Sequence, residues 1–369
     1  MSAGRKRILI VDDSAVMRSL LRTVIARDPM LEVAGTASQG EAGLDLAASL
    51  RPDLVLLDVE MPGMGGLATV KALRARGETM PVVMCSALTR RGATVTIEAL
   101  ADGASDYVAK PAGHADRSCA MEALAQDLLP KIRALTGRAS RAVQPNPFPA
   151  AGWCDRQRPV SVAEAAVVAI GVSTGGPQAL EILLGGLPAA FPLPVLVAQH
   201  MPELFTKTLA DRLAARCAMG VREAAAGEML RPGTVYVARG DWHMEVLPPA
   251  WIQAPASVRL TQTPPVNHCR PSVDVLLRSA VSVFGSGVLA VQLTGMGSDG
   301  LGGCSAVRQA GGTVLAQDEA TSAVWGMPRA VVEAGLAQQV LPIQEMADAI
   351  RSFVALAECA RSLREAAVS

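Results

Sequence analysis

The sequence predicts two α/β domains, each built on a doubly wound and mainly parallel sheet. Half of the 369 residues are hydrophobic but only 3% are aromatic. The cores must therefore consist of Ala, Val, Leu and Met, which suits parallel sheets covered by helices. A chain of this length also exceeds what one compact core usually holds. In each half, apolar runs typical of strands alternate with helical patterns, and a stretch rich in proline separates the halves.

The N-terminal half contains five predicted strand–helix units between residues 7 and 135. The predicted strands are RILIV, LEVAG, DLVLL, PVVMCS and DYVA, and the first four helices span residues 15–27, 40–50, 66–76 and 92–102. These strands are continuous apolar runs, which indicates a sheet covered on both faces. In such sheets the functional groups gather at the carboxyl ends of the strands.

Domain boundaries follow from a change in composition. We expect residues 1–136 to form the first domain and residues 137–160, which contain four prolines, to form a linker. The second domain, 161–360, has predicted strands AAVVAIGVS, PVLVAQ, VLAVQLT and TVLAQ, with shorter strands TVYVA, HMEVL and SVRL. Its predicted helices span residues 178–184, 204–216, 273–283 and 301–309, and residues 361–369 form a tail.

Charge and cysteine content exclude several classes of protein. Lys plus Arg (34) balances Asp plus Glu (34), so no overall field attracts nucleic acid or an anionic membrane. The apolar run near the N-terminus is too short for a signal peptide, and the uncharged stretch 279–298 is interrupted by polar residues, which favours a buried strand with its loops. Seven scattered cysteines without a C-x-x-C pair indicate reduced thiols. We expect a cytoplasmic protein without membrane insertion.

Polar side chains close several predicted strands of the first domain. Asp12 and Asp13 end the first strand and Asp58 ends the third, so three carboxylates should converge at one sheet edge. Carboxylate oxygens suit Mg²⁺, and Asp58 can act as a nucleophile toward a phosphoryl group. Ser86 and Lys110 end the fourth and fifth strands, where they can bind phosphoryl oxygens. Taken singly, each could be only a polar strand end or helix cap.

The first domain resembles the receiver domain of bacterial response regulators through VDDSAVMR, LLDVEMPGMGG, VVMCSA and SDYVAKP. The resemblance implies a flavodoxin-like fold with a five-stranded parallel sheet, and phosphorylation of Asp58 by a histidine kinase. It also implies that Ser86 and Tyr107 transmit the change. The implied Mg²⁺ ligands are the carboxylates of Asp12, Asp13 and Asp58 and the backbone carbonyl of Glu60.

Three strand ends in the second domain carry the residue types of a serine hydrolase. Ser173 in IGVSTGGP lies between a predicted strand and a helix, where glycines permit a tight turn. A serine hydroxyl needs a base, and His200 in AQHMP ends the next strand. The histidine needs an acid to orient it, and Asp299 follows a further apolar strand in TGMGSDG.

Other interpretations of these residues remain open from the pattern alone. The STGGP turn could bind a phosphate, although no P-loop lysine follows it. The G-x-S-x-G spacing also matches α/β-hydrolases, but that fold places its histidine after the acid, and no histidine follows Asp299. His243 or His268 could fit that order only with an earlier acid such as Asp211 or Asp241, and neither closes a strongly predicted strand.

The second domain resembles the catalytic domain of chemotaxis protein-glutamate methylesterases through GVSTGGP, VAQHMP, NHCRPSVDVLL, LTGMGSDG and QDEATSAVWGMP. The resemblance implies a Rossmann-like domain with a Ser173–His200–Asp299 triad and no cofactor for the esterase reaction. It makes the backbone N–H of Met296 an oxyanion donor and places Thr174 in the family's Ser-Thr pair. Support of the pocket and ordering of loops remain equally open roles for Thr294, His268, Arg270, Pro271 and Ser272.

Together the two resemblances imply a phosphorylation-activated esterase for chemotactic adaptation. Its substrates are expected to be glutamate γ-methyl esters on methyl-accepting chemoreceptors, which release methanol, and specific receptor glutamines. A receiver before the esterase suggests that the unphosphorylated receiver covers the active site. The alternatives are the same chemistry in a non-chemotactic sensory pathway, or a response regulator with a non-catalytic anion-binding output module.

Overall fold

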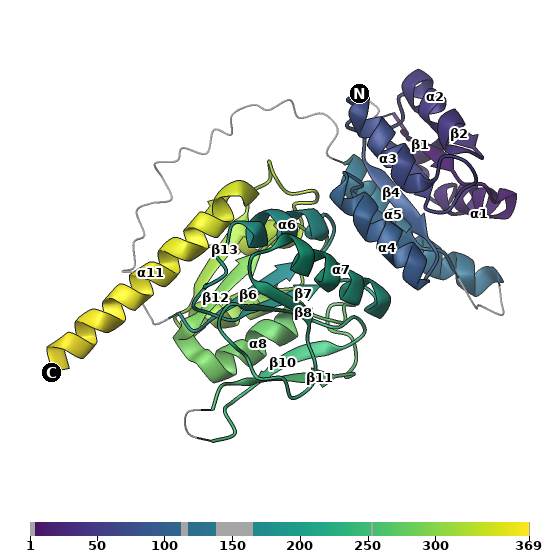
Figure 1. Ribbon diagram of the computed structural model, residues 1–369. Helices are drawn as coiled ribbons and strands as arrows, with labels where there is room; N and C mark the ends of the chain where they lie inside the picture. Colours follow the sequence, from purple (N-terminus) through teal and green to yellow (C-terminus); the bar gives the residue numbers. More distant parts are fainter. Residues whose placement is uncertain (1–3, 112–116, 138–164, 252–253, 369) are drawn as a thin grey trace.

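The computed structural model describes residues 4–111, 117–137, 165–251 and 254–368. Two domains lie side by side, the first in purple and blue and the second in teal to yellow (Figure 1). The predicted linker falls almost entirely outside the described residues. Both domains are α/β, which confirms the predicted fold class.

The first domain contains one five-stranded parallel sheet in the order β2-β1-β3-β4-β5. The strands are β1 (Lys6–Val11), β2 (Leu31–Ala37), β3 (Leu54–Asp58), β4 (Val82–Ser86) and β5 (Asp106–Ala109). The helices are α1 (Ala15–Ile25), α2 (Gly40–Leu50), α3 (Gly66–Ala75), α4 (Arg90–Ala101) and α5 (Arg117–Thr136). In α1 the apolar residues recur every three or four positions, so one face is buried while Ser14 caps its first turn.

The second domain is built on a seven-stranded parallel sheet in the order β14-β13-β12-β6-β7-β9-β8. The strands of this sheet are β6 (Val167–Val172), β7 (Val195–Gln199), β8 (Gly220–Glu223), β9 (Thr234–Val237), β12 (Val288–Gln292), β13 (Thr313–Gln317) and β14 (Gln339–Leu341). A separate antiparallel hairpin pairs β10 (His243–Leu247) with β11 (Ser257–Thr261). The central strands β6, β7 and β12 are fully buried, as their continuous apolar runs predict.

Helices cover both faces of this sheet. Buried side chains of α6 (Gly176–Gly185), α7 (Glu203–Arg216) and α11 (Ile343–Val368) pack on one face. Those of α8 (Val273–Phe284), α9 (Leu301–Gln309) and α10 (Met327–Glu333) pack on the other, together with the hairpin.

Two local expectations differ from the structure. The stretch 279–298 begins as the last part of α8, which ends at Phe284 and is followed by Gly285 with a φ of 53°, before strand β12. The expected tail 361–369 continues α11, which runs to Val368, because no glycine or proline interrupts this segment. No helix in the described part of the chain is long and apolar enough to cross a membrane.

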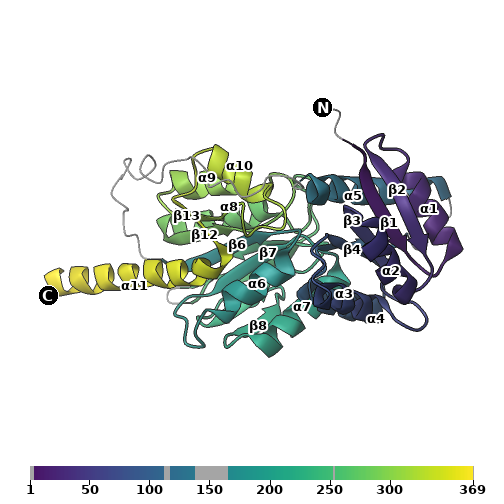
Figure 2. The ribbon, with the colours of Figure 1, turned by 90° about the horizontal axis from the view of Figure 1, so that it is seen from above.

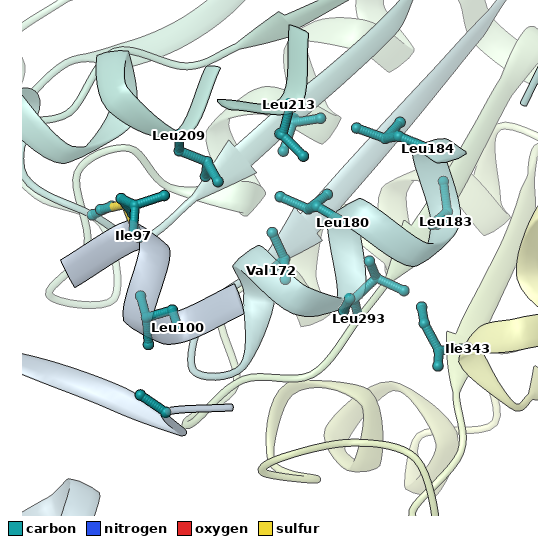
Figure 3. Close-up of a cluster of buried hydrophobic side chains, with 14 of the residues drawn as sticks. Ile97, Leu100, Val172, Leu180, Leu183, Leu184, Leu209, Leu213, Leu293 and Ile343 are labelled. Carbon is teal, nitrogen blue, oxygen red and sulfur yellow. The ribbon is translucent and has the colours of Figure 1, made fainter. Parts of the chain in front are cut away.

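The domains share a buried apolar contact. Ile97 and Leu100 of α4 belong to the same cluster of buried side chains as Val172, Leu180 and Leu209 of the second domain (Figure 3). Figure 2, viewed from above, also places α4 beside α7. The face of the receiver-like domain that contains α4, β5 and α5 therefore packs against the end of the second sheet where Ser173 lies.

Candidate active site

Ser173 is held in a turn that three strands position. The register pairs Val172 with Gln199, so Ser173 and His200 leave neighbouring strands at the same level. The Ser173 N–H donates to the carbonyl of Thr294, and its carbonyl accepts a bond of 3.0 Å from the Gln199 side chain. Gly295 must be glycine, because a Cβ there would lie 2.8 Å from Cβ of Ser173. The backbone of Ser173 is thus fixed by contacts within the second domain.

His200 and Asp299 form a buried ion pair. Nε2 of His200 lies 2.8 Å from Oδ2 of Asp299, whose side chain is 2% exposed. Asp299 also accepts bonds from Nδ2 of Asn267 (2.9 Å), Oγ of Ser272 (2.8 Å) and the N–H of Val273 (2.7 Å). Sequence reasoning missed Asn267, although it lies inside the NHCRPS motif, because its partner is 32 residues away.

These contacts set the protonation states of Asp299 and His200. Burial opposes ionisation of Asp299, but the bonds from His200 and Asn267 outweigh burial and lower its pKa to about 2. Burial likewise opposes the imidazolium of His200, but Asp299 and the sulfur of Cys269 raise the pKa of His200 to about 9. The pair therefore favours a charged carboxylate and a protonated ring at neutral pH.

The free nitrogen of His200 faces a cysteine that the sequence analysis did not single out. Sγ of Cys269 lies 3.6 Å from Nδ1 of His200. Within the described residues, no hydrogen bond joins the Ser173 hydroxyl to His200. The structure therefore brings together the histidine and the acid, while the serine lies nearby without bonding to the base.

Contacts assign a role to three of the five residues left open as pocket or loop groups. Ser272 donates to Asp299, and Thr294 Oγ donates to the carbonyl of Thr174 at 2.8 Å, so both support the site. Arg270 pairs with Asp241 and donates to loop carbonyls, which is a loop-ordering role. Pro271 follows a cis peptide bond, and His268 is exposed with a positive φ.

His243 is a buried structural residue. It is fully buried and accepts at Nδ1 from the N–H of Ser272, while its Nε2 lies 3.2 Å from the carbonyl oxygen of Pro264. Asp211 pairs with Lys207 on the exposed face of α7. Neither contact builds a second triad with the order of α/β-hydrolases.

The two residues expected on the oxyanion side both contact the first domain. Oγ1 of Thr174 donates to Oδ2 of Asp106, at the start of β5, at 2.6 Å, and both side chains are buried. Met296 and Val324 belong to a cluster that includes receiver residues of α1 and α5. Burial raises the pKa of Asp106, while the ammonium of Lys131, 4.0 Å away, opposes that shift.

A stacked aromatic pair joins the domains beside this hydrogen bond. The rings of Tyr107 and Phe205 lie 4.6 Å apart at an interplanar angle of 12°. Lys131 lies 5.1 Å from the Tyr107 ring centroid and donates to the Tyr107 carbonyl at 2.7 Å. The predicted switch residue Tyr107 is therefore part of the contact with the second domain.

The carboxylates predicted in the first domain converge. Metal-ligating oxygens of Asp12, Asp13 and Asp58 lie within 4.8 Å of one another. The ammonium of Lys110 is 2.7 Å from Asp58 and 2.9 Å from Asp12, so a cation already occupies part of the cluster. Burial raises the pKa of Asp58 to about 6 against the opposing effect of Lys110. This oxygen-rich set fits Mg²⁺.

Ser86 and Glu60 flank the same cluster. Ser86 is fully buried at the end of β4, and its hydroxyl donates to the carbonyl of Ala87 at 3.2 Å. The N–H of Glu60 donates to Asp58 at 3.3 Å. Both residues lie where the sequence places them, at the carboxyl edge of the sheet.

An aspartate cluster on a flavodoxin-like sheet, joined to a Ser, His and Asp group on a second parallel sheet, defines a response regulator with a hydrolase output domain. Residues 8–121 match the response regulator receiver domain family and residues 168–350 match the CheB methylesterase family. The chain therefore belongs to the CheB methylesterase family, and it carries a receiver domain before the methylesterase domain.

Relatives with known names are similar in sequence to most of this chain. A protein-glutamate methylesterase/protein-glutamine glutaminase of Nocardioides sp. is 49% identical over 92% of this chain and 93% of its own length. One from Trichodesmium erythraeum is 42% identical over 93% of this chain and 97% of its own length. The crystal structure of the Thermotoga maritima CheB methylesterase catalytic domain is 41% identical and covers 52% of this chain and 98% of that chain, with a TM-score of 0.49.

Proposed function

We propose that this chain hydrolyses glutamate γ-methyl esters on methyl-accepting chemoreceptors and deamidates specific receptor glutamines. The family and the names of its relatives support this class of substrate. The observation that carries the proposal is the buried His200–Asp299 pair, at 2.8 Å, beside the turn of Ser173. A histidine held by an acid next to a serine is the arrangement of serine hydrolases.

Ser173 attacks the γ-carbonyl carbon of the ester. Because Asp299 holds Nε2 of His200, Nδ1 is the nitrogen left to take the serine proton. His200 then returns that proton to the departing methoxide, which leaves as methanol. Water hydrolyses the acyl-enzyme through the same base and regenerates Ser173 with a free glutamate carboxylate.

The tetrahedral intermediate places negative charge on the former carbonyl oxygen. Backbone N–H groups near the Ser173 turn and at Met296 are the proposed donors, with Thr174 supporting the turn. Loss of one such donor typically costs about 100- to 1,000-fold in rate. Methanol leaves more readily than ammonia, so demethylation is the faster of the two reactions.

The docked receiver inhibits the hydrolase in this proposal. The Asp106–Thr174 bond and the Tyr107–Phe205 stack support it, because Thr174 adjoins Ser173 and Phe205 lies on α7, the helix that follows His200. The imidazole in this arrangement favours its protonated form and makes no bond to Ser173, which suits an inactive state. Undocking opens the turn to substrate and lets the Ser173 hydroxyl rotate toward the base.

Phosphorylation of Asp58 shifts the docking equilibrium. Asp12, Asp13, Asp58 and the backbone carbonyl of Glu60 are proposed to hold Mg²⁺, which neutralises charge on the transferring phosphoryl group when bound. Lys110 and Ser86 bind phosphoryl oxygens, and a histidine kinase is the donor. The movement of Ser86 and Tyr107 weakens the domain contact. Coupling between sites is typically about 1–3 kcal/mol, which corresponds to about 5- to 150-fold activation.

The test measures methanol release from methylated chemoreceptors with and without a small-molecule phosphodonor and Mg²⁺. We expect Ser173→Ala to abolish release and Asp58→Asn to keep basal release but lose stimulation. Ser305→Ala, on the exposed side of α9, serves as the matched control and retains both. Undiminished release from a folded Ser173→Ala variant refutes the assignment of the nucleophile.

A further inference from the structure

The thiol of Cys269 and the free nitrogen of His200 face each other in the active site. Sγ and Nδ1 are 3.6 Å apart, and both side chains are only partly exposed. The proposed hydrolysis gives Cys269 no role. Ligand atoms of Cys269, His200 and Asp299 lie within 4.8 Å of one another. A thiol, an imidazole and a carboxylate are the side chains that most often bind Zn²⁺.

We propose that Cys269 and His200 form a reversible Zn²⁺ site that inhibits the enzyme. Bonds of about 2.3 Å to sulfur and about 2.0 Å to nitrogen, at a tetrahedral angle, place the two ligand atoms about 3.5 Å apart. The observed separation of 3.6 Å meets this requirement without movement of either backbone segment. As the metal binds, the thiol of Cys269 and the protonated Nδ1 of His200 each release a proton to solvent.

Asp299 supports this site by orienting the His200 ring and does not bind the metal itself. A metal-binding histidine usually donates its second ring N–H to a carboxylate, which fixes the ring and raises its basicity. Nε2 of His200 already makes that bond to Asp299. Asn267, Ser272 and Val273 engage the oxygens of Asp299, so the carboxylate orients the ring and leaves direct ligation to sulfur and Nδ1.

Metal binding stops catalysis because it occupies the nitrogen of His200 that acts as the base. The lone pair of Nδ1 that accepts the serine proton becomes a metal ligand, so His200 cannot activate Ser173. Two protein ligands leave the other positions to solvent, and a chelator therefore removes the ion. The inhibition by Zn²⁺ rests on the proposed function, because it needs His200 to act as the base. The binding of Zn²⁺ to Cys269 and His200 does not depend on the proposed function.

The first test uses Co²⁺ alone as a spectroscopic probe of the full-length chain without a histidine tag. We expect a near-ultraviolet thiolate-to-Co²⁺ absorption band that added Zn²⁺ removes. Cys269→Ser and, independently, His200→Gln lose the band. Cys217→Ser keeps it, because Cys217 lies at the end of α7, where burial raises the pKa of its thiol to about 11. A wild-type chain without the band, or a Cys269→Ser chain that keeps it, overturns the site.

The second test measures methanol release against Zn²⁺ concentration. Wild type and Cys217→Ser lose activity and recover it with chelator, while Cys269→Ser keeps its own metal-free rate. A chain with the Co²⁺ band whose methanol release is insensitive to Zn²⁺ overturns the inhibition. A chain that releases no methanol under any condition refutes the proposed function instead, and the absorption band still decides the metal site.

Discussion

We predict that replacing Asp106 by alanine weakens the docking of the receiver domain on the hydrolase domain. The substitution leaves the hydrolase domain itself unchanged. The carboxylate of Asp106 is buried and accepts the hydroxyl of Thr174 at 2.6 Å across the domain contact. In the undocked state water forms a hydrogen bond with the Thr174 hydroxyl. Removal of the Asp106 carboxylate therefore destabilises only the docked state. We therefore expect Asp106→Ala to raise the basal esterase rate of the unphosphorylated protein.

The size of the increase follows from the strength of the bond. A hydrogen bond to a charged group contributes about 1.5–3 kcal/mol, and a neutral one about 0.5–1.5 kcal/mol. With 1.4 kcal/mol per factor of ten, a charged Asp106 predicts about 10- to 150-fold activation. Burial raises the pKa of Asp106, so protonation at lower pH reduces the effect toward about 2- to 10-fold. Full phosphorylation of the wild type sets the upper limit.

The assay is methanol release without phosphodonor, and Asp127→Ala is the matched control. Asp127 also pairs with Lys131, at 2.8 Å, but lies exposed on α5. We expect the control to keep the wild-type basal rate. If a folded Asp106→Ala protein is no more active than the control, the Asp106–Thr174 bond does not hold the receiver on the hydrolase, and the reasoning fails.

Four further outcomes test the two sites. Asn267→Ala removes one donor to the buried carboxylate of Asp299, so kcat should fall by about tenfold or more, while an unchanged kcat would show that Asn267 does not position the acid. In metal-free buffer kcat/KM should rise with pH through the pKa of His200, about 9, because the base must be unprotonated. Cys269→Ser should move that midpoint to lower pH, since the sulfur favours the protonated ring, and an unmoved midpoint contradicts this. Phosphodonor titration of wild type against Asp58→Asn should show saturable, Mg²⁺-dependent stimulation only in the wild type.

The positions of the aspartate cluster and of Ser173, His200 and Asp299 were predictable because each residue ends a buried parallel strand or lies in the loop that follows one. Continuous apolar runs give the strands, and parallel strands place their carboxyl ends at one sheet edge. Asp12 and Asp58 converge for this reason, as do Ser173 and His200 on paired strands. These features depend on local periodicity, which the sequence carries directly.

Contacts between distant segments were decided only by the tertiary structure. The sequence does not say which ring nitrogen of His200 faces Asp299, or that Cys269, 69 residues from His200, lies against the other. Asp106 and Thr174 meet across 68 residues and two domains. No periodic pattern encodes such a meeting, because it depends on how two finished domains pack. The sequence by itself determined two groups of polar residues at two sheet edges, whereas the packing of α4, β5 and α5 decided that the first domain lies against the residues around Ser173.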